Sequence, residues 1–549
     1  MKKKGIYSDS HMKVDHRKVP SVNIIGAGLA GLSAALALSR MGIPCRLISP
    51  MPSERAQSVM AEGGINAALD TMGENDTPYD HYEDTMRGGV YLADPNAVWA
   101  LCSRAPETVG MLLSLGAALR TENDRPVLRN FGGQKKKRTA YAKSSTGKIL
   151  MTALTDAVRR YEAEGLVKRY SHHRLHSLCI RNGECLGAEV ADLHSRVITE
   201  LKGSVILASG GMYSLFPGLT TGSAVNTGDV TALAFVSGAE LADLEFIQYH
   251  PTTFPIAGKR CLISEAARGE GGRLFALRNG KPWYFMQEKH PVLGDLSPRD
   301  VVSREIELVR NDKGCGGKVF LDMTGLEDYV WKNRLSDLRE ECIRYLRRDP
   351  ATYPVEVSPG IHYFMGGINV DEHHRTNIAG LYAAGECACQ YHGANRLGGN
   401  SMLGAVFGGQ VAAESAASEL SEKNTGEKEA GSLPPDEVMQ PVGVRKEAAK
   451  LLRDSLGIFR SGKKLEAAAD KIPELIGAED STLQRNRLRL GQAVLLSALN
   501  RRESRGAHTR TDYPETDDEH YRKTTVAVFD RNEVKISFRD IPEKRGGAG

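Results

Sequence analysis

The chain has 549 residues, too many for one hydrophobic core, and we expect about three or four domain-sized units. Apolar residues make up 41% and charged residues 26%, which is the composition of a globular protein and not of a disordered one. The formal net charge of +4 is small for this length, so no nucleic acid partner is expected.

No apolar run approaches the length of a membrane span, and Met1–Ser21 has three early lysines without the apolar core of a secretory signal. A cytoplasmic protein is therefore expected, reaching the cytoplasmic face of a membrane only through a partner. The nine cysteines form no C-x-x-C pair, so neither an iron–sulfur cluster nor a metal site is expected. Cys387 and Cys389, the closest pair, are interpreted as core thiols. Any electrons would come from a diffusible donor or from another subunit.

The first predicted elements are a buried strand over 22–25, an alanine-rich helix over 32–41 and a second strand over 43–49. This β-α-β start is typical of a dinucleotide-binding fold. Two later apolar runs, 205–211 and 381–386, predict further buried strands that end in glycine.

The segment between His250 and His362 lies between those two later strands and is predicted to be an insertion that caps the nucleotide domain. Residues 422–441 have the composition of a linker, and 444–502 have helical spacing with few breakers. Residues 545–549 are predicted to be a frayed tail.

A glycine motif, Gly26-x-Gly28-x-x-Gly31, follows the first strand and opens the first helix. Glycine at these places allows a tight turn, close approach of the backbone to a pyrophosphate and close packing of helix on strand. The free N–H groups of the helix then face the phosphates. Ser49 stands at the end of the second strand, where a generic NAD site has an acidic residue.

Five further motifs follow in order: Gln248–Thr252, Ser264-Glu265, Pro298–Asp300, Gly360–Gly367 and His392–Ser401. Together these motifs resemble the flavoprotein subunits of succinate dehydrogenases and fumarate reductases, over about residues 22–538. The resemblance implies an α/β fold with a Rossmann-like FAD-binding domain over 20–247 and 362–425. It also implies an inserted α+β capping domain over 248–361 and a C-terminal helical domain over 440–549.

In this family an Arg-Ser-His-Thr element precedes two glycines, and in many members its histidine bonds covalently to the flavin. Gln57 stands in that place, so FAD is predicted to be held non-covalently, which tilts the interpretation towards fumarate reduction. Glu386, after a buried strand and a glycine, suits a ribityl or ribose hydroxyl; the plainer alternative is an acid favoured by a helix dipole. The FAD contacts that the resemblance implies are Gly26, Gly28, Ala30, Gly31, Ser49, Gln57, Ser58, Gly63, Gly64, Asp229, Glu386, Arg396, Ser401 and Leu403.

The resemblance also implies a pocket for fumarate or succinate, in which hydride passes from FAD N5 and a proton from Arg299. Glu265 and Arg268 would relay that proton. His362 and Arg396 match the clamp on one carboxylate, and the residues that match the site of the other are His250, Ser264 and Glu265. Phe131 matches an aromatic residue that twists bound fumarate. Taken singly, His250 could be an ordinary loop residue, and Arg299 could pair with Asp300 or Asp295.

An iron–sulfur subunit is the partner that the resemblance implies. The alternatives are an L-aspartate oxidase, a reductase of another unsaturated acid, and a non-catalytic flavoprotein. Phe131 stands where the aspartate oxidases have a glutamate that recognises the substrate amine, which disfavours the first. Two charged or polar groups are interpreted as surface: His172, His173 and His176, and the basic run Lys135–Arg138.

Overall fold

The computed structural model describes residues 22–545 except 143–144, 224, 421–425 and 439–442. Residues 1–21 and most of the predicted tail over 545–549 therefore lie outside the described residues.

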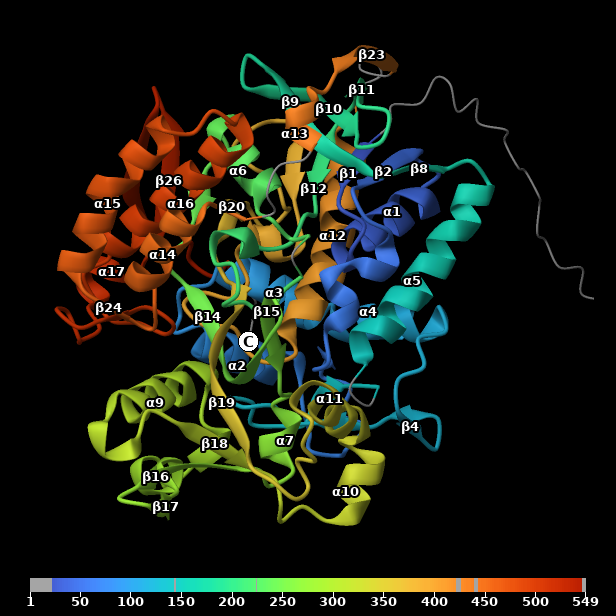
Figure 1. The fold of residues 1–549 in the computed structure, drawn as a ribbon. Coiled ribbons are helices and arrows are strands. Elements are labelled where there is room, and N and C mark those ends of the chain that lie inside the picture. Colours follow the sequence, from blue (N-terminus) through green and yellow to red (C-terminus); the bar gives the residue numbers. More distant parts are fainter. Residues whose placement is uncertain (1–21, 143–144, 224, 421–425, 439–442, 546–549) are drawn as a thin grey trace, which may run out of the picture.

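The centre of the fold is a five-stranded parallel sheet in the order β21-β12-β1-β2-β8 (Figure 1). Asn23 of β1 pairs with Val205 on one side and Arg46 on the other, so the chain reverses its direction of winding at β1. The strands are β1 (Val22–Ile25), β2 (Cys45–Ser49), β8 (Val167–Ser171), β12 (Val205–Leu207) and β21 (Leu381–Ala383). Every apolar run predicted as a strand forms one. The observed strand is two residues shorter at the start of β2, four shorter at the end of β12 and three shorter at the end of β21.

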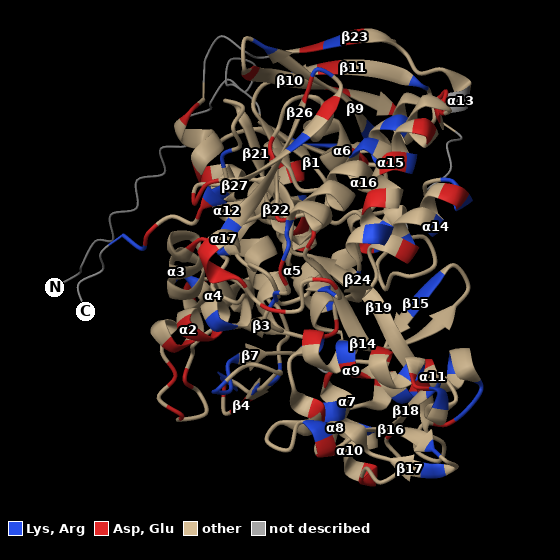
Figure 2. Ribbon diagram, turned by 90° about the vertical axis from the view of Figure 1, so that its left-hand side faces the viewer, with Lys and Arg blue, Asp and Glu red and all other residues tan. Residues whose placement is uncertain are grey.

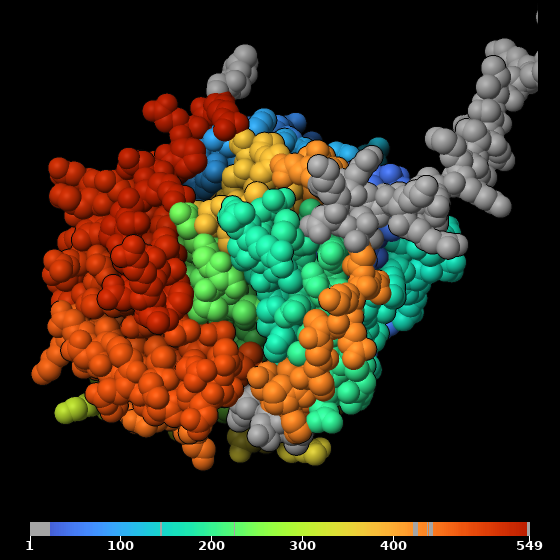
Figure 3. Space-filling view, turned by 90° about the horizontal axis from the view of Figure 1, so that it is seen from above, coloured from blue at the N-terminus to red at the C-terminus, as the bar shows by residue number. Residues whose placement is uncertain are grey.

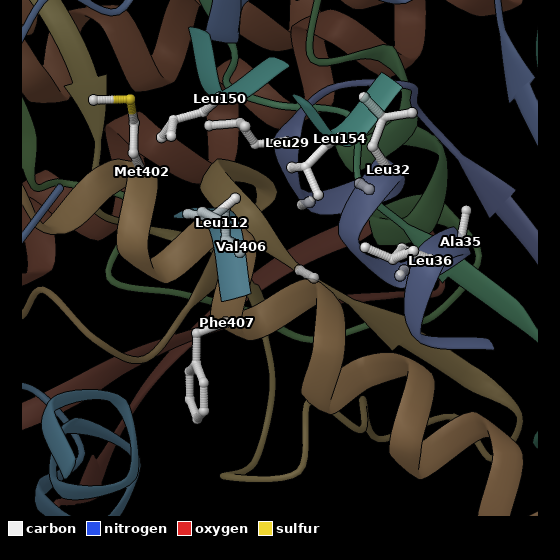
Figure 4. Packing of buried hydrophobic residues seen from close by; sticks show 14 of the residues in the cluster. Leu29, Leu32, Ala35, Leu36, Leu112, Leu150, Leu154, Met402, Val406 and Phe407 are labelled. Atoms are coloured by element: carbon white, nitrogen blue, oxygen red, sulfur yellow. The ribbon is translucent and has the colours of Figure 1, made fainter. Parts of the chain in front are cut away.

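Helix α1 (Leu29–Arg40) begins three residues earlier than predicted, because its N-cap is Gly28 and the turn directly follows the glycine motif. It packs between α12 (Asn400–Ser418) and α5 (Thr146–Ala163), and α4 (Ala105–Ser114) closes the cluster (Figure 4). The buried side chains that meet there are Leu29, Leu32, Leu36, Leu112, Leu150, Leu154, Met402, Val406 and Phe407. Helix α12 is therefore held against α1 by apolar burial, although the two helices lie far apart in the sequence.

A second, antiparallel sheet has the order β23-β11-β10-β9, with β9 (His173–Arg181), β10 (Glu184–Asp192), β11 (Val197–Lys202) and β23 (Glu427–Ser432). The prediction of a linker over 422–441 is wrong here, since β23 lies inside it and pairs with β11 from Leu201 to Val197. A polar, glycine-containing segment forms a strand because an edge of the sheet offers it a full set of backbone partners. Residues 421–425 and 439–442 of that linker lie outside the described part.

The inserted segment folds around an antiparallel sheet, seen in Figure 1, and has a hydrophobic core of its own. The sheet has the order β15-β14-β19-β18-β16-β17, and the longest pair is β14 (Ile247–Ile256) with β19 (Val355–Phe364). The other strands are β15 (Lys259–Leu262), β16 (Arg273–Arg278), β17 (Lys281–Trp283) and β18 (Val319–Asp322). Helix α9 (Arg299–Asn311) packs on β14, β18 and β19. The other helices of this segment include the α7 turn (Ala266–Gly269), α10 (Asp328–Asn333) and α11 (Ser336–Leu346).

The C-terminal domain begins with the predicted helices α14 (Lys446–Ser455), α15 (Gly462–Gly477) and α16 (Thr482–Asn500). It is not wholly helical, because β26 (Lys523–Asp530) and β27 (Glu533–Asp540) extend the sheet of β22 (Ala388–Cys389), β20 (Gly367–Asn369) and β13 (Leu241–Ala242). The pairing of Leu241 with Ala527 thus fastens this domain to the rest. Figure 3 shows the C-terminal domain from above, in orange and red, beside the rest of the chain.

Basic and acidic residues alternate over all parts of the ribbon (Figure 2). Among the residues that the structure describes, no helix combines the length and the apolar character that crossing a membrane requires.

Candidate active site

A cavity of about 490 Å³ lies between the parallel sheet and the capping domain. One end is lined by the glycine turn after β1 and the other by side chains from β14, β19 and the start of α9. Residues from all three predicted domains contribute to its wall.

The glycine turn is shaped for a ligand that approaches the backbone. Gly26 has φ +123°, and a Cβ there would lie 2.2 Å from the carbonyl oxygen of Ala208. A Cβ on Gly31 would lie 1.8 Å from the Gly26 oxygen, so α1 can approach β1 only with glycine at that position. Gly28 caps α1 without a side-chain hydrogen bond, and Gly28, Leu29 and Ala30 line the cavity. The free N–H groups of α1 can therefore receive the pyrophosphate of a dinucleotide such as FAD.

The segment after β2 forms the next part of the wall. Ser58 Oγ accepts a hydrogen bond from the Leu29 N–H at 3.3 Å, and Gln57 Oε1 accepts one from the Ser223 N–H at 2.5 Å. Gln57, Ser58, Gly63 and Gly64 all line the cavity. Ser49 also lines it, and its hydroxyl donates to the Met51 carbonyl at 2.6 Å.

Glu386 lies on the cavity wall directly after β21. Its Oε1 accepts hydrogen bonds from the Tyr213 hydroxyl at 2.6 Å and the Phe364 N–H at 3.3 Å. Burial raises the pKa of Glu386 to about 7. The carboxyl group is thus fixed on one oxygen by the protein, which suits a ligand hydroxyl on the other.

Asp229, which also lines the cavity, is bound by a residue of the C-terminal domain. Arg487 of α16 contacts Asp229 through Nε at 2.5 Å and Nη2 at 2.9 Å, and both side chains line the cavity. His173 and Arg174 of β9 line it as well. His173, predicted to be a surface residue, is half-buried; β9 begins at this residue, and its ring centroid lies 5.2 Å from that of Tyr170. His172 is exposed and His176 half-buried.

The capping domain brings together the three residues predicted to move a proton. Arg299 Nε and Nη2 contact Glu265 Oε2 at 3.0 Å and 2.9 Å. Arg268 Nη2 lies 3.7 Å from the other oxygen of Glu265, and the Gly132 N–H donates to that oxygen at 3.2 Å. Although burial alone would raise it, Arg299 and Arg268 lower the pKa of Glu265 below its ordinary value. Arg299 pairs with neither Asp300 nor Asp295, the plainer partners considered from the sequence.

Arg396 and Arg299 both donate a hydrogen bond to the side-chain amide of one residue, Gln248. Gln248 Oε1 accepts from Arg396 Nη2 at 2.8 Å and from Arg299 Nη1 at 3.4 Å. The Arg396 guanidinium lies 4.4 Å from the ring centroid of Tyr363, and burial, followed by the charge of Arg299, lowers the pKa of Arg396 to about 10. Gln248 was not predicted as a site residue, although its place two residues before His250 on β14 puts it on the same strand face.

His362 and His250 complete this end, with ring centroids 5.2 Å apart. The Nδ1 atom of His362 lies 2.9 Å from the Thr221 hydroxyl, and Nδ1 of His250 lies 3.3 Å from the Thr252 nitrogen. Burial and then the charge of Arg299 lower the pKa of both histidines well below the ordinary value. Both rings are therefore neutral at pH 7 and act as hydrogen-bonding groups, not as charges.

Ser264 and Phe131 lie on the same part of the wall. The Ser264 hydroxyl accepts a bond from the Ala266 N–H at 3.4 Å. The Phe131 ring lies against Gly63 and Gly398, where a Cβ on Gly398 would come within 3.0 Å of the Phe131 Cβ. The loops that carry Gly63 and Gly398 therefore pack closely on the Phe131 ring and fix it between the two ends of the cavity.

Three predicted site residues do not line the cavity: Gly31, Arg268 and Leu403. Gly31 packs α1 on β1, and Arg268 stands behind Glu265 with no exposed side-chain surface. Leu403 is fully buried in the cluster around α1. All other predicted FAD and substrate residues line the cavity.

The basic run Lys135–Arg138 is not wholly the solvated face that was predicted. Arg138 is fully buried and pairs with Asp76 at 3.0 Å and Asp84 at 2.9 Å. Asp76 lies just before helix α2 (Pro78–Gly88) and Asp84 lies within it. Cys387 and Cys389 are buried, as predicted.

Comparison with known proteins places these residues in a family. Residues 21–402 match the FAD binding domain family, and residues 445–545 match the fumarate reductase flavoprotein C-terminal family. The chain is 38% identical over 564 aligned positions to the succinate dehydrogenase flavoprotein subunit of Bacillus subtilis, covering 95% of this chain and 96% of the relative. It is 33% identical to the L-aspartate oxidase of Streptomyces coelicolor, covering 95% and 94%.

Among solved structures, the E. coli quinol fumarate reductase FrdA superposes with a TM-score of 0.83 at 28% identity, covering 96% of this chain and 97% of that one. The match spans the parallel sheet, the capping insertion and the C-terminal domain alike. The chain therefore belongs to the family of FAD-dependent succinate dehydrogenase and fumarate reductase flavoprotein subunits.

Proposed function

We propose that this flavoprotein reduces fumarate to succinate, with FAD held non-covalently and with electrons that arrive from another protein. The observation that carries the proposal is the series of contacts Arg299–Glu265–Arg268. Its Arg299 end lines the same part of the cavity as Arg396, His362 and His250. FAD, when bound, supplies the hydride for this reduction.

The charges at this end of the cavity suit a small dianion. Arg299 and Arg396 each present a guanidinium, and the neutral rings of His250 and His362 add hydrogen bonds without adding charge. A dicarboxylate buried between them exchanges water for charge-assisted bonds at both ends. Gln248 holds the two guanidinium groups at a fixed separation before the substrate arrives.

Arg299 is the proposed proton donor. As hydride reaches one alkene carbon, negative charge builds on the other, and a carbanion-like carbon is basic enough to take a proton from a guanidinium. Glu265 contacts Arg299 through two bonds and can return a proton to it, and Arg268 can in turn supply Glu265. The reaction balances as one hydride and one proton added across the double bond of fumarate.

Phe131 is proposed to press on the bound substrate. Its ring is wedged between Gly63 and Gly398, so it cannot retreat when fumarate enters. A rigid wall of this kind can twist one carboxylate out of the plane of the alkene and excludes water from the reacting carbons.

Gln57 supports the proposals of non-covalent FAD and of fumarate as the physiological substrate. An amide side chain cannot form the covalent bond that a histidine forms with flavin, and here its oxygen is engaged by the Ser223 N–H. In the family, the covalent bond accompanies a higher flavin potential and succinate oxidation. We propose an iron–sulfur subunit as the electron partner, a cytoplasmic location, and contact with a membrane only through a partner subunit.

L-Aspartate oxidase is the second candidate function, because a relative of that name aligns over 95% of the chain. The position of Phe131 argues against it. An ammonium group at this position would meet an apolar ring beside the Arg129 guanidinium, whose carbon lies 5.1 Å from the ring centroid. A site for an amino acid requires an acceptor there.

The test is anaerobic. The FAD-loaded chain is reduced and mixed with fumarate while the flavin spectrum is recorded, and a second sample of oxidised protein is mixed with L-aspartate. Rapid reoxidation by fumarate with no bleaching by aspartate supports the proposal. Bleaching by aspartate establishes the oxidase, and no response to either excludes both functions.

A further inference from the structure

Three aromatic rings on the outer face of α2 (Pro78–Gly88) and α3 (Pro95–Ser103) surround one lysine ammonium. Lys544 Nζ lies 4.2 Å from the ring centroid of Tyr82, 5.1 Å from that of Trp99 and 5.3 Å from that of Tyr79. Tyr82 and Trp99 meet edge to face at 5.9 Å, so the walls of this aromatic cage support each other. Converging ring faces are the arrangement that binds organic cations.

The backbone on both sides of Lys544 is held by one side chain. Asn96 Nδ2 donates to the Glu543 carbonyl at 3.1 Å, and Asn96 Oδ1 accepts from the Arg545 N–H at 2.9 Å. The side-chain amide of Asn96 thus bonds the backbone on both sides of Lys544, as a neighbouring β-strand would. These two bonds fix the direction of the segment and direct the Lys544 side chain into the cage.

The residues on either side of the cage make further contacts. Arg545 pairs with Glu372 at 2.5 Å, and Ile541 packs on the buried cluster that contains Tyr363, Met365 and Ala394. Residues 541–545, which we call the strap, therefore leave β27 of the C-terminal domain and cross to α3 of the FAD-binding domain.

We propose that the outer face of α2 and α3 is a binding site for an extended peptide with a lysine ammonium, which the chain fills with its own residues 543–545. The cage selects the ammonium, Asn96 selects the extended backbone, and Glu372 selects a cation at the next residue. By filling the site, the strap fastens the C-terminal domain across the FAD-binding domain at a point separate from the sheet formed by β13 and β26.

Helix α2, which carries Tyr79 and Tyr82 of the cage, also contacts the loops of the active site. On its inner face, His81 Nε2 and Thr85 Oγ1 each lie 2.9 Å from the side chain of Asn400, the first residue of α12. Asp84 accepts a bond from the Lys135 N–H at 3.0 Å, in the loop that carries Gly132. The strap thus braces a helix whose other face supports the walls of the cavity.

The test measures how easily Lys544 leaves the cage. A lysine-specific endoprotease is added to the intact protein under native conditions, and loss of residues 545–549 is followed by intact mass. Trp99→Ala removes one wall, and we expect cleavage after Lys544 to become about two- to fivefold faster, as one exposed cation–π contact predicts. Asn96→Ala removes the backbone contacts without touching the rings and should accelerate the same cleavage.

Trp283→Ala is the matched control, because Trp283 of the capping domain also stacks with cations but lies far from the strap in sequence and fold. We expect its cleavage rate to equal that of the wild type. Equal rates for the wild type, Trp99→Ala and Asn96→Ala would overturn the proposal. Acceleration by Trp283→Ala as large as by Trp99→Ala would also overturn it, since the effect would then be a general loss of stability.

Discussion

Gln248 lies between the positively charged groups of Arg299 and Arg396. Its hydrogen bonds explain how the two charges can lie close together before a substrate binds. Its amide oxygen accepts a bond from each guanidinium, and its amide nitrogen donates to Asn395 Oδ1 and to the Arg396 carbonyl at 2.9 Å each. Burial and mutual repulsion would otherwise separate Arg299 and Arg396. The pair is thus positioned before substrate binds, which lowers the cost of organising the transition state.

Replacing Arg299 by glutamine should remove the proton donor and keep the shape of the wall. We expect turnover of fumarate to fall about 10²- to 10⁴-fold, as for loss of a general acid, while FAD binding is retained. Stopped-flow reoxidation of the reduced flavin measures the first quantity and its absorbance the second. Arg304→Gln, one turn along α9 and paired with Asp300, is the control and should stay near wild-type turnover. Comparable loss in both variants would mean that α9, not the guanidinium, was disturbed.

The side chain at Gln57 leads to a prediction about cofactor retention. Because an amide forms no covalent bond to flavin, precipitating the holoprotein with acid should release all the yellow colour into the supernatant. Absorbance of pellet and supernatant measures this directly. A pellet that keeps its flavin after washing would contradict the non-covalent proposal and would require a different attachment residue.

At the scale of single elements, the glycine turn shows how one missing side chain permits a whole helix to pack. Gly31→Ala would place a methyl group 1.8 Å from the Gly26 oxygen, so α1 must shift away from β1. We expect a loss of about 1–3 kcal/mol in the free energy of unfolding, together with weaker FAD binding. Denaturant unfolding and flavin titration measure the two effects.

Gly110→Ala is the matched control for that substitution. Gly110 is an exposed residue inside α4, and a Cβ there meets nothing within 4 Å. Alanine should therefore stabilise the protein by about 0.5–1 kcal/mol. If both alanines destabilise the protein equally, steric contact at Gly31 is not the reason for the glycine.

At the scale of the whole molecule, buried ion pairs join the C-terminal domain to the rest. Arg501 contacts Glu245 at 2.6 Å and Glu503 at 2.9 Å, and all three side chains are fully buried. Arg505 contacts Glu503 at 2.8 Å. The polar residues that follow α16 thus pair partly with each other and partly with the segment before β14. Because each charge is desolvated, removal of Arg501 would leave the buried carboxylate of Glu245 without its ion-pair partner.

Asp243 belongs to this network and gives it a dependence on pH. Burial and then the charge of Glu245 raise its pKa from 3.8 to about 7, against the lowering effect of Arg501. A carboxyl group with a raised pKa in the folded state stabilises the fold fully at low pH, and that contribution is lost as pH rises through about 7.

We therefore expect the wild type to lose stability relative to Asp243→Asn as pH rises from about 4, near the ordinary pKa, to about 7. Thermal unfolding of both proteins across that range is the measurement. Asp518→Asn, an exposed partner of Arg505, should follow the wild-type profile. Parallel profiles for wild type and Asp243→Asn would show that Asp243 does not titrate in this window.

Much of the fold could be predicted because local patterns were unambiguous. The strands β1, β12 and β21 are apolar runs that end in glycine, and a buried parallel strand has no other simple pattern. The order of motifs also predicted which arginines and histidines would meet. Strand β23 could not be predicted, because a polar segment becomes a strand only when a partner edge such as β11 is present.

The sequence by itself determined the glycine turn and the amide at position 57, since each depends on residue types at fixed spacing, and its motifs indicated the family. The resemblance to that family implied that Arg299, Glu265 and Arg268 act together, and the structure shows their contacts. Only the tertiary structure decided that Gln248 joins the two arginines, that Arg487 of α16 reaches the cavity, and that Arg138 is buried. These contacts join residues far apart in sequence, and their energies come from burial and charge pairing that exist only after the domains have packed.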